Sequence, residues 1–286
     1  MHVAFQGEPG AFSEEAAGIL FANHQVVPLP SMESVFEAVV QGDVERGVIP
    51  IENSLFGSVH INYDHLRSHD VSIVGELKLR IRHCLMALPG AALDKITSVL
   101  SHPQALGQCK TFIRKELPQA QTVLAYDTAG SAKLVAQSND LLQAAIAPRR
   151  AAAQYGLQIL ASHIESHAQN YTRFLALAQR GEGHTLAHTG DQPLKTSIVF
   201  APRSNVPGVL FKSLAVFFLR DLDLFKVESR PLVGSPGEYL FYLDVEGGTR
   251  DPVLQLALEH LKEISAELRV LGSYPQGPTW DGVDDG

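Results

Sequence analysis

The sequence predicts an α/β fold in two parts. Up to about residue 180, short apolar runs alternate with stretches whose apolar residues have helical spacing. Residues 181–194 are turn-rich and poorly apolar, and a second series of strand and helix patterns follows them. Alternating strands and helices indicate a sheet with helices on its faces, and the break indicates a linker between two domains.

In the first part, apolar runs predict strands at residues 3–5, 48–51, 97–100, 122–125 and 144–147. Helices are expected to begin at Ser13, Ser31, Thr128 and Pro148, and another is expected to pass through Phe112 and end before Pro118. Ser31 is a typical helix cap, and Gly42 is a typical stop for the helix that Ser31 begins. In open sheets of this kind, ligands bind beyond the carboxyl ends of the strands, often between two lobes.

Residues 195–275 predict a compact second module. Strands are expected at residues 197–200, 224–230, 239–245 and 270–272. One helix is expected to begin at Pro207 and end at Leu219, and another to follow the cap Asp251. The resulting order, βαββαβ, is that of the ferredoxin-like fold. Residues 276–286 are rich in Gly and Asp and predict a flexible tail.

Composition excludes several classes of partner. The formal net charge is −8 and no basic tract is present, which argues against nucleic acid and anionic membranes. The N-terminus lacks the pattern of a signal peptide, and no apolar run approaches the roughly 20 residues that span a bilayer. Two cysteines are too few for a disulfide framework. We therefore expect a cytoplasmic protein with reduced thiols.

The most informative segment is Asn170-Tyr171-Thr172-Arg173-Phe174, which opens an apolar run that predicts a strand. A buried hydroxyl and guanidinium cost free energy unless each meets a partner, so this strand is expected to border a pocket. Thr172 and Phe174 share one face of the strand. Arg173 points away, and it enters the same pocket only if the strand twists or ends there. Otherwise it is a structural anchor.

Further polar residues follow predicted strands or begin predicted helices. They are Ser13 in the segment Gly7-Glu8-Pro9-Gly10-Ala11-Phe12-Ser13-Glu14, then Glu52, Asn53 and Ser54, then Ser101, His102 and Gln104, then Thr128, Ala129 and Ser131. Backbone N–H groups at helix starts can hold an anion, and His102 can titrate near neutral pH. The alternative is structural, because the same residue types cap helices and form turns.

Together these segments resemble the prephenate dehydratase family over nearly the whole chain, with Thr172-Arg173-Phe174 as its signature. The resemblance implies conversion of prephenate to phenylpyruvate, with loss of water and carbon dioxide and without a cofactor. It also implies the monofunctional form, with a catalytic domain over residues 1–180 that is similar to type II periplasmic binding proteins. The second of its two lobes is expected at about residues 78–163.

By the same resemblance, Thr172, Arg173 and Phe174 are the catalytic residues, and the ten polar or helix-start residues from Ser13 to Ser131 named above bind substrate. A threonine hydroxyl is a poor acid at neutral pH. We therefore expect Thr172 to donate a hydrogen bond to the leaving hydroxyl, with a proton relayed from His102, Glu52 or water. Arg173 keeps its proton, so its expected role is to grip a carboxylate.

The C-terminal module resembles an ACT domain, a small amino-acid-sensing fold. The resemblance implies that phenylalanine, as effector, binds at Asn205, Val206, Pro207, Gly208, Val209 and Leu210 and at Glu228, Ser229, Arg230 and Pro231, between paired domains. It also implies a homodimer or homotetramer. Val209 replaces the Ala usual in the family, which leaves the sensitivity open. The alternative is a domain that only forms dimers.

Two rival functions remain at this point. The first is the same chemistry on arogenate, and the second is a non-catalytic sensor that binds amino acids. A metal site is not predicted, because neither the group His60, His65 and His69 nor the pair His184 and His188 has a zincin-type arrangement.

Overall fold

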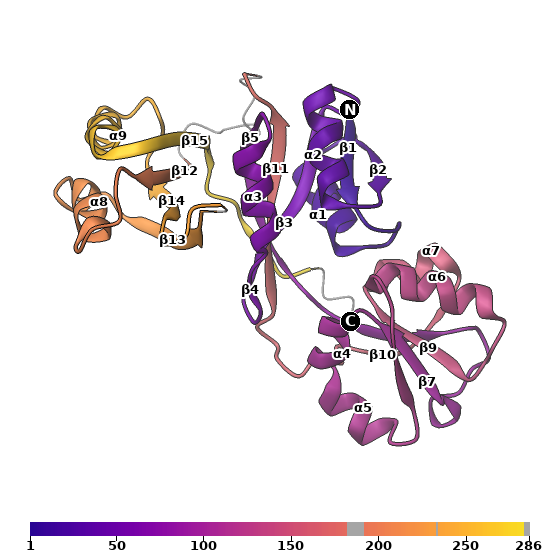
Figure 1. Cartoon of the computed structure of the whole chain (residues 1–286). Coiled ribbons are helices and arrows are strands. Elements are labelled where there is room, and N and C mark those ends of the chain that lie inside the picture. Colours follow the sequence, from indigo (N-terminus) through magenta and orange to yellow (C-terminus); the bar gives the residue numbers. More distant parts are fainter. Residues whose placement is uncertain (182–191, 233, 283–286) are drawn as a thin grey trace.

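The computed structural model describes residues 1–181, 192–232 and 234–282, and it arranges them as two lobes and a C-terminal domain (Figure 1). Each of the three parts is built on its own β-sheet. The predicted linker, residues 181–194, falls mostly outside the described residues. No helix in the described part of the chain has the length and apolar character needed to cross a membrane.

The first lobe is a mixed sheet in the order β16-β5-β11-β3-β1-β2, with β4 paired to β3. Its strands are β1 (His2–Gln6), β2 (Gln25–Leu29), β3 (Arg46–Asn53), β4 (Gly57–Ser58), β5 (Val71–Arg80), β11 (Tyr171–Gln179) and β16 (Thr279–Trp280), and its helices are α1 (Phe12–Leu20), α2 (Met32–Gln41) and α3 (His60–Ser68). As predicted, Ser31 caps α2 with a capping box and Gly42 ends it with φ 77°. β11 runs antiparallel to both β3 and β5, so it lies in the middle of the sheet.

The second lobe is a five-stranded sheet in the order β10-β6-β9-β7-β8. Its elements are β6 (Cys84–Ala87), η1 (Leu93–Lys95), β7 (Ser98–Ser101), α4 (Pro103–Gln108), α5 (Lys110–Glu116), β8 (Gln121–Leu124), α6 (Thr128–Ser138), β9 (Gln143–Ala147), α7 (Arg149–Tyr155) and β10 (Gln158–Ser162). β5 stays in the first sheet as far as Arg80, so this lobe begins later than the predicted residue 78. The chain therefore crosses between the lobes at residues 81–83 and again at 163–170.

The C-terminal domain has the predicted βαββαβ order and an antiparallel sheet in the order β13-β14-β12-β15. Its elements are β12 (Leu194–Pro202), α8 (Val209–Phe218), β13 (Leu224–Pro231), β14 (Tyr239–Glu246), α9 (Pro252–Ile264) and β15 (Ser265–Pro275). Pro207 was predicted to be the first residue of α8, and this is wrong. Gly208, with φ 81°, turns the chain first, and the helix begins at Val209.

The C-terminal domain shares a hydrophobic core with the first lobe. One face of its sheet is covered by its own helices, with Phe200, Phe217 and Leu254 fully buried. The other face packs on α3 and β5, where the Tyr63 and Tyr242 rings lie 4.9 Å apart and the Tyr242 hydroxyl donates to the Tyr63 carbonyl. The two units are therefore joined by a continuous core.

The predicted flexible tail is ordered as far as Gly282, which corrects the sequence analysis. β16 pairs in parallel with the outer edge of β5, and the Lys78 amide donates to the Pro278 carbonyl at 3.0 Å. Gly277 allows this approach, because a Cβ there would lie only 2.0 Å from the Glu76 carbonyl oxygen. The tail thus covers a sheet edge that would otherwise be exposed.

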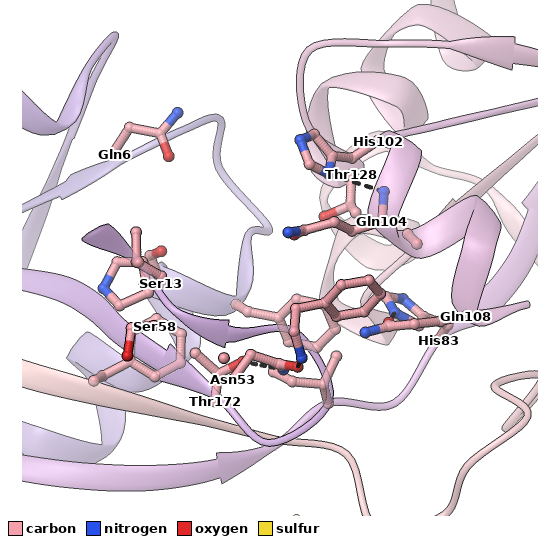
Figure 2. Close-up of a pocket in the computed structure, with 18 of the residues that line it drawn as sticks. Gln6, Ser13, Asn53, Ser58, His83, His102, Gln104, Gln108, Thr128 and Thr172 are labelled. Atoms are coloured by element: carbon pink, nitrogen blue, oxygen red, sulfur yellow. Dashed lines mark hydrogen bonds between the residues drawn. The ribbon is translucent and has the colours of Figure 1, made fainter. Parts of the chain in front are cut away.

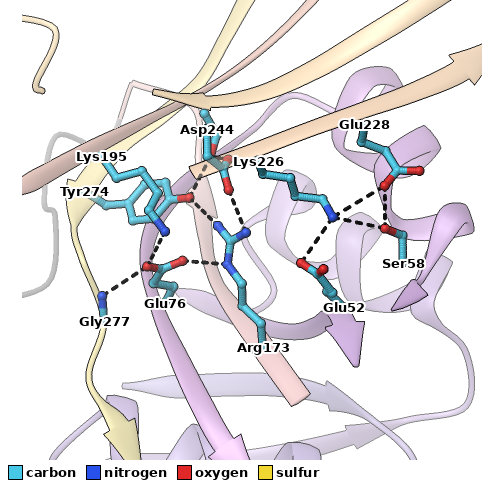
Figure 3. A network of polar contacts seen from close by, with 11 residues as sticks. Glu52, Ser58, Glu76, Arg173, Lys195, Lys226, Glu228, Asp244, Tyr274 and Gly277 are labelled. Atoms are coloured by element: carbon cyan, nitrogen blue, oxygen red, sulfur yellow. Dashed lines mark hydrogen bonds and ion pairs between the residues drawn. The ribbon is translucent and has the colours of Figure 1, made fainter. Parts of the chain in front are cut away.

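A buried ionic network crosses the junction between the first lobe and the C-terminal domain (Figure 3). Arg173 Nε lies 2.6 Å from Glu76 Oε2, and Arg173 Nη1 lies 2.6 Å from Asp244 Oδ2. Lys195 Nζ contacts the other Glu76 oxygen at 2.7 Å, and Tyr274 accepts a hydrogen bond from Arg173. Burial alone would raise the pKa of Asp244, but the Arg173 guanidinium, the Ser197 hydroxyl and the Lys195 ammonium together outweigh it, and the pKa lies below its ordinary value.

Replacing Arg173 by Met is expected to lower the free energy of unfolding by about 3–5 kcal/mol, because Glu76 and Asp244 would keep buried charges without this partner. Urea unfolding of the whole chain measures the loss. The matched control is Arg180→Met, which removes an ion pair to Asp70 whose side chains are 53% and 68% exposed. Such exposed pairs contribute about 0.2–1 kcal/mol. Equal losses in the two variants would contradict the assigned anchoring role.

Candidate active site

A cavity of about 420 Å³ lies between the two lobes. Its polar lining comes from both lobes and from the crossing segment between them (Figure 2). These residues are Gln6, Ser13, Asn53, Ser58 and Thr172 of the first lobe, His83 of the crossing, and His102, Gln104, Gln108 and Thr128 of the second lobe. The cavity lies beyond the carboxyl ends of β1, β3 and β7, where an α/β sheet is expected to bind ligands.

Asn53 and Thr172 form the centre of the polar lining (Figure 2). They are paired across β3 and β11, and Asn53 Nδ2 donates to Thr172 Oγ1 at 3.0 Å. The orientation of the Asn53 amide is fixed, because its Oδ1 accepts the backbone N–H groups of Leu55 and Phe56 at 3.0 and 3.1 Å. Since Thr172 Oγ1 accepts from Asn53, its own proton is available to be donated elsewhere.

Phe174 lies with Thr172 on the cavity side of β11, as strand alternation predicts, and Arg173 points to the opposite face. The expected contact of Arg173 with a substrate carboxylate is therefore wrong for this cavity. Its guanidinium is held by Glu76, Asp244 and Tyr274 in the domain junction. The sequence analysis had kept this anchoring role open as the alternative.

Glu52 and Ser54 were also predicted to bind substrate, and the structure places both outside the cavity between the lobes. They line a separate cavity of about 540 Å³ at the domain junction. Glu52 pairs with Lys226 at 3.1 Å, and Ser54 Oγ donates to the Gln169 carbonyl at 3.1 Å. The physical reason is again alternation, because neighbouring residues of β3 face opposite sides of the sheet. Glu52 is therefore excluded as the proton relay.

Three predicted residues of the second lobe are structural. Ser101 Oγ donates to the Ile146 carbonyl at 2.6 Å, and Ser131 Oγ donates to the Asp127 carbonyl at 2.7 Å. Ala129 is fully buried in the core of the lobe. Ser101 is the last residue of β7, and Ala129 and Ser131 are in the first turn of α6, but all three side chains are turned inward and do not line the cavity between the lobes.

His102, Gln104 and Thr128 do line that cavity, at the starts of α4 and α6. His102 Nδ1 accepts the Gln104 backbone N–H at 3.3 Å, so the proton of the neutral ring is on Nε2. Burial lowers the pKa of His102, and the nearby Asp127 opposes this shift only in part. His102 is therefore neutral at physiological pH, which makes it a donor of a hydrogen bond rather than a strong acid.

His83 and Gln108 were missed by the sequence analysis. His83 Nε2 lies 2.6 Å from Gln108 Oε1, and because that oxygen can only accept, the His83 proton is on Nε2. Its Nδ1 is buried without a hydrogen-bond partner. Burial lowers the pKa of this ring as well. The signal in the sequence was a polar residue between two apolar strands, where the chain crosses from one lobe to the other.

Among the described residues that line the cavity, none is Lys, Arg, Asp or Glu. Positive potential instead comes from helix starts. Ser13 is in the first turn of α1, which has no side-chain cap, whereas α6, which begins at Thr128, is capped by the Asp127 carboxylate. The free N–H groups at helix N-termini attract anions, so the cavity can hold a carboxylate without an ion pair.

The two segments predicted to bind an effector do not converge within one chain. Asn205 borders a small cavity of about 20 Å³, which none of the residues Glu228–Pro231 lines. Glu228 and Arg230 instead face the first lobe, where Glu228 contacts Ser58 and Arg230 pairs with Asp64 at 3.2 Å. Ser229 and Pro231 alternate to the exposed face of β13. The effector site expected at these segments, between paired domains, stays a prediction.

The histidines considered for a metal have other contacts. His65 and His69 pack on Phe36, and His60 lies 3.3 Å from Glu228. His184 and His188 fall outside the described residues. Within the described ranges, the His, Cys, Asp and Glu side chains form no group of three that could hold a metal ion.

Comparison with known proteins gives consistent relatives. A family model described as prephenate dehydratase matches residues 3–182. The Arabidopsis thaliana protein named arogenate dehydratase/prephenate dehydratase 2, chloroplastic, is 46% identical over 288 residues, which cover 98% of this chain and 74% of that protein. The Petunia hybrida protein named arogenate dehydratase 2 is 46% identical over 96% of this chain and 72% of its own length.

Two solved structures have the same fold. One is titled as a prephenate dehydratase in complex with L-Phe from Arthrobacter aurescens, with 30% identity and a TM-score of 0.88 over 99% of this chain and 92% of that one. The other is titled GqqA, a novel type of quorum quenching acylase, with 32% identity and a TM-score of 0.88 over 97% and 99% of the two chains. The family model and the relatives, together with the cavity built around Thr172, show that this chain is an enzyme that belongs to the prephenate dehydratase family.

Proposed function

We propose that the protein converts prephenate to phenylpyruvate in the cavity between the lobes. The observation that carries this proposal is the Asn53–Thr172 pair, which presents a hydroxyl with its proton free to be donated. Among the described residues, no hydroxyl that lines the cavity hydrogen-bonds an imidazole, the arrangement that activates a nucleophile for acyl transfer. We therefore prefer dehydration to hydrolysis as the reaction of this site.

The reaction moves one electron pair through the substrate ring. The bond from the ring to its carboxylate breaks and releases carbon dioxide, its electrons complete the aromatic ring, and the C–O bond on the opposite side breaks. The leaving oxygen takes a proton and departs as water. Negative charge develops on that oxygen in the transition state, so a positioned donor such as the Thr172 hydroxyl accelerates the reaction. The Asn53 hydrogen bond polarises this hydroxyl further.

The neutral lining suits this chemistry. The carboxylate that leaves must lose its charge, and a guanidinium paired with it would stabilise the ground state more than the transition state. The position of Arg173 in the domain junction avoids this. The carboxylate of the pyruvyl side chain, which keeps its charge, can be held at the N-terminus of α1, which has no side-chain cap.

The same lining favours prephenate over arogenate. Arogenate carries an ammonium in place of the ketone, and buried ammonium groups require a charged partner. No Asp or Glu is found among the described residues that line the cavity. Arogenate stays the second candidate because several plant relatives that are 43–46% identical are named arogenate dehydratases.

We further propose that the C-terminal domain is an ACT domain through which chains associate and phenylalanine regulates the enzyme. Support comes from its βαββαβ fold, from the L-Phe complex of the Arthrobacter aurescens relative, and from an exposed apolar surface on α8 and β13. On that surface Phe211 is 77% and Phe218 79% exposed, and β13 is an edge strand. Such a surface is suited to a second copy of the chain.

We also propose that the protein works in a reducing compartment such as the cytoplasm, since Cys84 and Cys109 are buried and unpaired.

The proposal predicts rapid formation of phenylpyruvate from prephenate by the purified protein. Replacing Thr172 by Val, which keeps the shape but removes the donor, is expected to lower kcat by about 10²–10³-fold. Thr172→Ser is the matched control and is expected to keep most of the activity. An unmutated protein that turns over arogenate faster than prephenate would reverse the choice of substrate, and a fully active Thr172→Val variant would remove the assigned role.

A second prediction concerns pH. Protonation of His102 removes the lone pair that accepts the Gln104 N–H, and burial lowers its pKa from the ordinary value of 6.5. The active neutral form is therefore kept above pH 6.5, and kcat/KM is expected to fall only at lower pH. The His102→Asn variant retains a good helix cap. Its profile of kcat/KM against pH is expected to lose the fall at low pH (the acidic limb), or to show that fall where His83 titrates. An acidic limb that is unchanged in the variant would exclude His102 as its source.

A further inference from the structure

The loop between β3 and β4, residues 54–56, borders the cavity and is connected to the Asn53–Thr172 pair. Leu55 and Phe56 donate their backbone N–H groups to Asn53 Oδ1, which sets the direction in which the Asn53 amide faces Thr172. Phe56 lines the cavity and is 49% exposed, so the loop lies where the cavity opens to solvent. The loop therefore holds the Asn53 amide that donates to Thr172 Oγ1.

The C-terminal domain holds the far end of this loop through Ser58 (Figure 3). Ser58 Oγ donates to Glu228 Oε2 at 2.6 Å and accepts from Lys226 Nζ at 3.1 Å. Lys226 also pairs with Glu52 Oε2 at 3.1 Å, and Glu52 is opposite Ser58 in the β3–β4 ladder. Two side chains of β13 thus fix both strands that flank the loop.

These contacts are well sheltered from solvent. The side chains of Lys226 and Glu228 are 12% and 18% exposed, so their charges are screened less than those of surface pairs. Lys226 and Glu228 are two residues apart on β13, so both face the first lobe, while Val227 between them faces solvent. Ser58 lines the cavity between the lobes and also takes part in the domain junction.

We propose that Ser58 is a positioning residue through which Glu228 and Lys226 of the C-terminal domain hold the loop, and with it Asn53 and Thr172, in the catalytic arrangement. The inference rests on the proposed function and adds a physical route for its regulation. Any event that draws Glu228 away from Ser58, such as an ammonium-bearing effector at the start of the segment Glu228–Pro231, would loosen the loop and slow the reaction.

The test compares two carboxylates that cross the same domain junction. Glu228→Ala removes the partner of Ser58, whereas Glu267→Ala removes an ion pair to Arg67 on α3 that does not contact the loop. Hydrogen exchange of the Leu55 and Phe56 amides reports on the loop without any substrate. Glu228→Ala and Ser58→Ala are expected to speed this exchange, and Glu267→Ala is expected to leave it unchanged.

The kinetic arm is a double-mutant cycle. Ser58→Ala and Glu228→Ala are each expected to lower kcat by about 3- to 30-fold, and the double variant by no more than the larger single loss, because both break one contact. Multiplied losses, or equal effects of Glu228→Ala and Glu267→Ala on exchange, would overturn the proposal. A protein inactive on prephenate and arogenate would refute the proposed function alone, since the exchange arm would still decide the role of Ser58.

Discussion

Side chains of β3 and β11 point alternately to the two faces of the first sheet, and the rest of the molecule is arranged around this alternation. Asn53 and Thr172 are paired on one face and border the cavity between the lobes, while Glu52 and Arg173 are paired on the other face and enter the domain junction. Neutral hydrogen-bonding groups thus lie where, under the proposed function, a carboxylate loses its charge, and the ion pairs lie where the two domains are held together. The pairing of β3 with β11 therefore positions both the residues that line the cavity and the residues that form the ion pairs.

The alternation of side chains along β11 also explains why the signature Thr172-Arg173-Phe174 combines residues with different functions. Thr172 and Phe174 face the cavity, and Arg173 between them is buried against Glu76 and Asp244. A buried guanidinium is tolerated because these carboxylates surround it, and removing any one partner leaves an uncompensated charge. β11 therefore lines the cavity at Thr172 and is bonded to the C-terminal domain at the next residue, Arg173. Ser58 and Glu228 add a second connection at the edge of the cavity.

Much of the fold was predictable, because local signals agreed with it. Ser31 and Gly42 bound α2, Asp251 caps α9, and the βαββαβ order of elements in the C-terminal domain followed from its pattern. The long strand β5 and helix α3 were not predicted. In β5 the apolar residues Val71, Ile73, Leu77 and Leu79 alternate with mostly polar ones, a strand pattern that the sequence analysis overlooked, whereas α3 is mostly polar. Which polar residues reach the cavity was only partly predictable. His102, Gln104 and Thr128 do, but Ser101 and Ser131 turn inward to backbone carbonyls, a choice made by tertiary packing. His83 and the ordered tail depend on contacts distant in sequence.

The division of β11 between catalysis and anchoring is tested most directly by a crystal structure of the protein with a dicarboxylate analogue of prephenate that cannot react. The account predicts that the analogue lies between the lobes, with the oxygen that stands for the leaving hydroxyl within hydrogen-bond distance of Thr172 Oγ1, and that Arg173 stays bonded to Glu76 and Asp244. An analogue whose carboxylate is paired with Arg173 would contradict it.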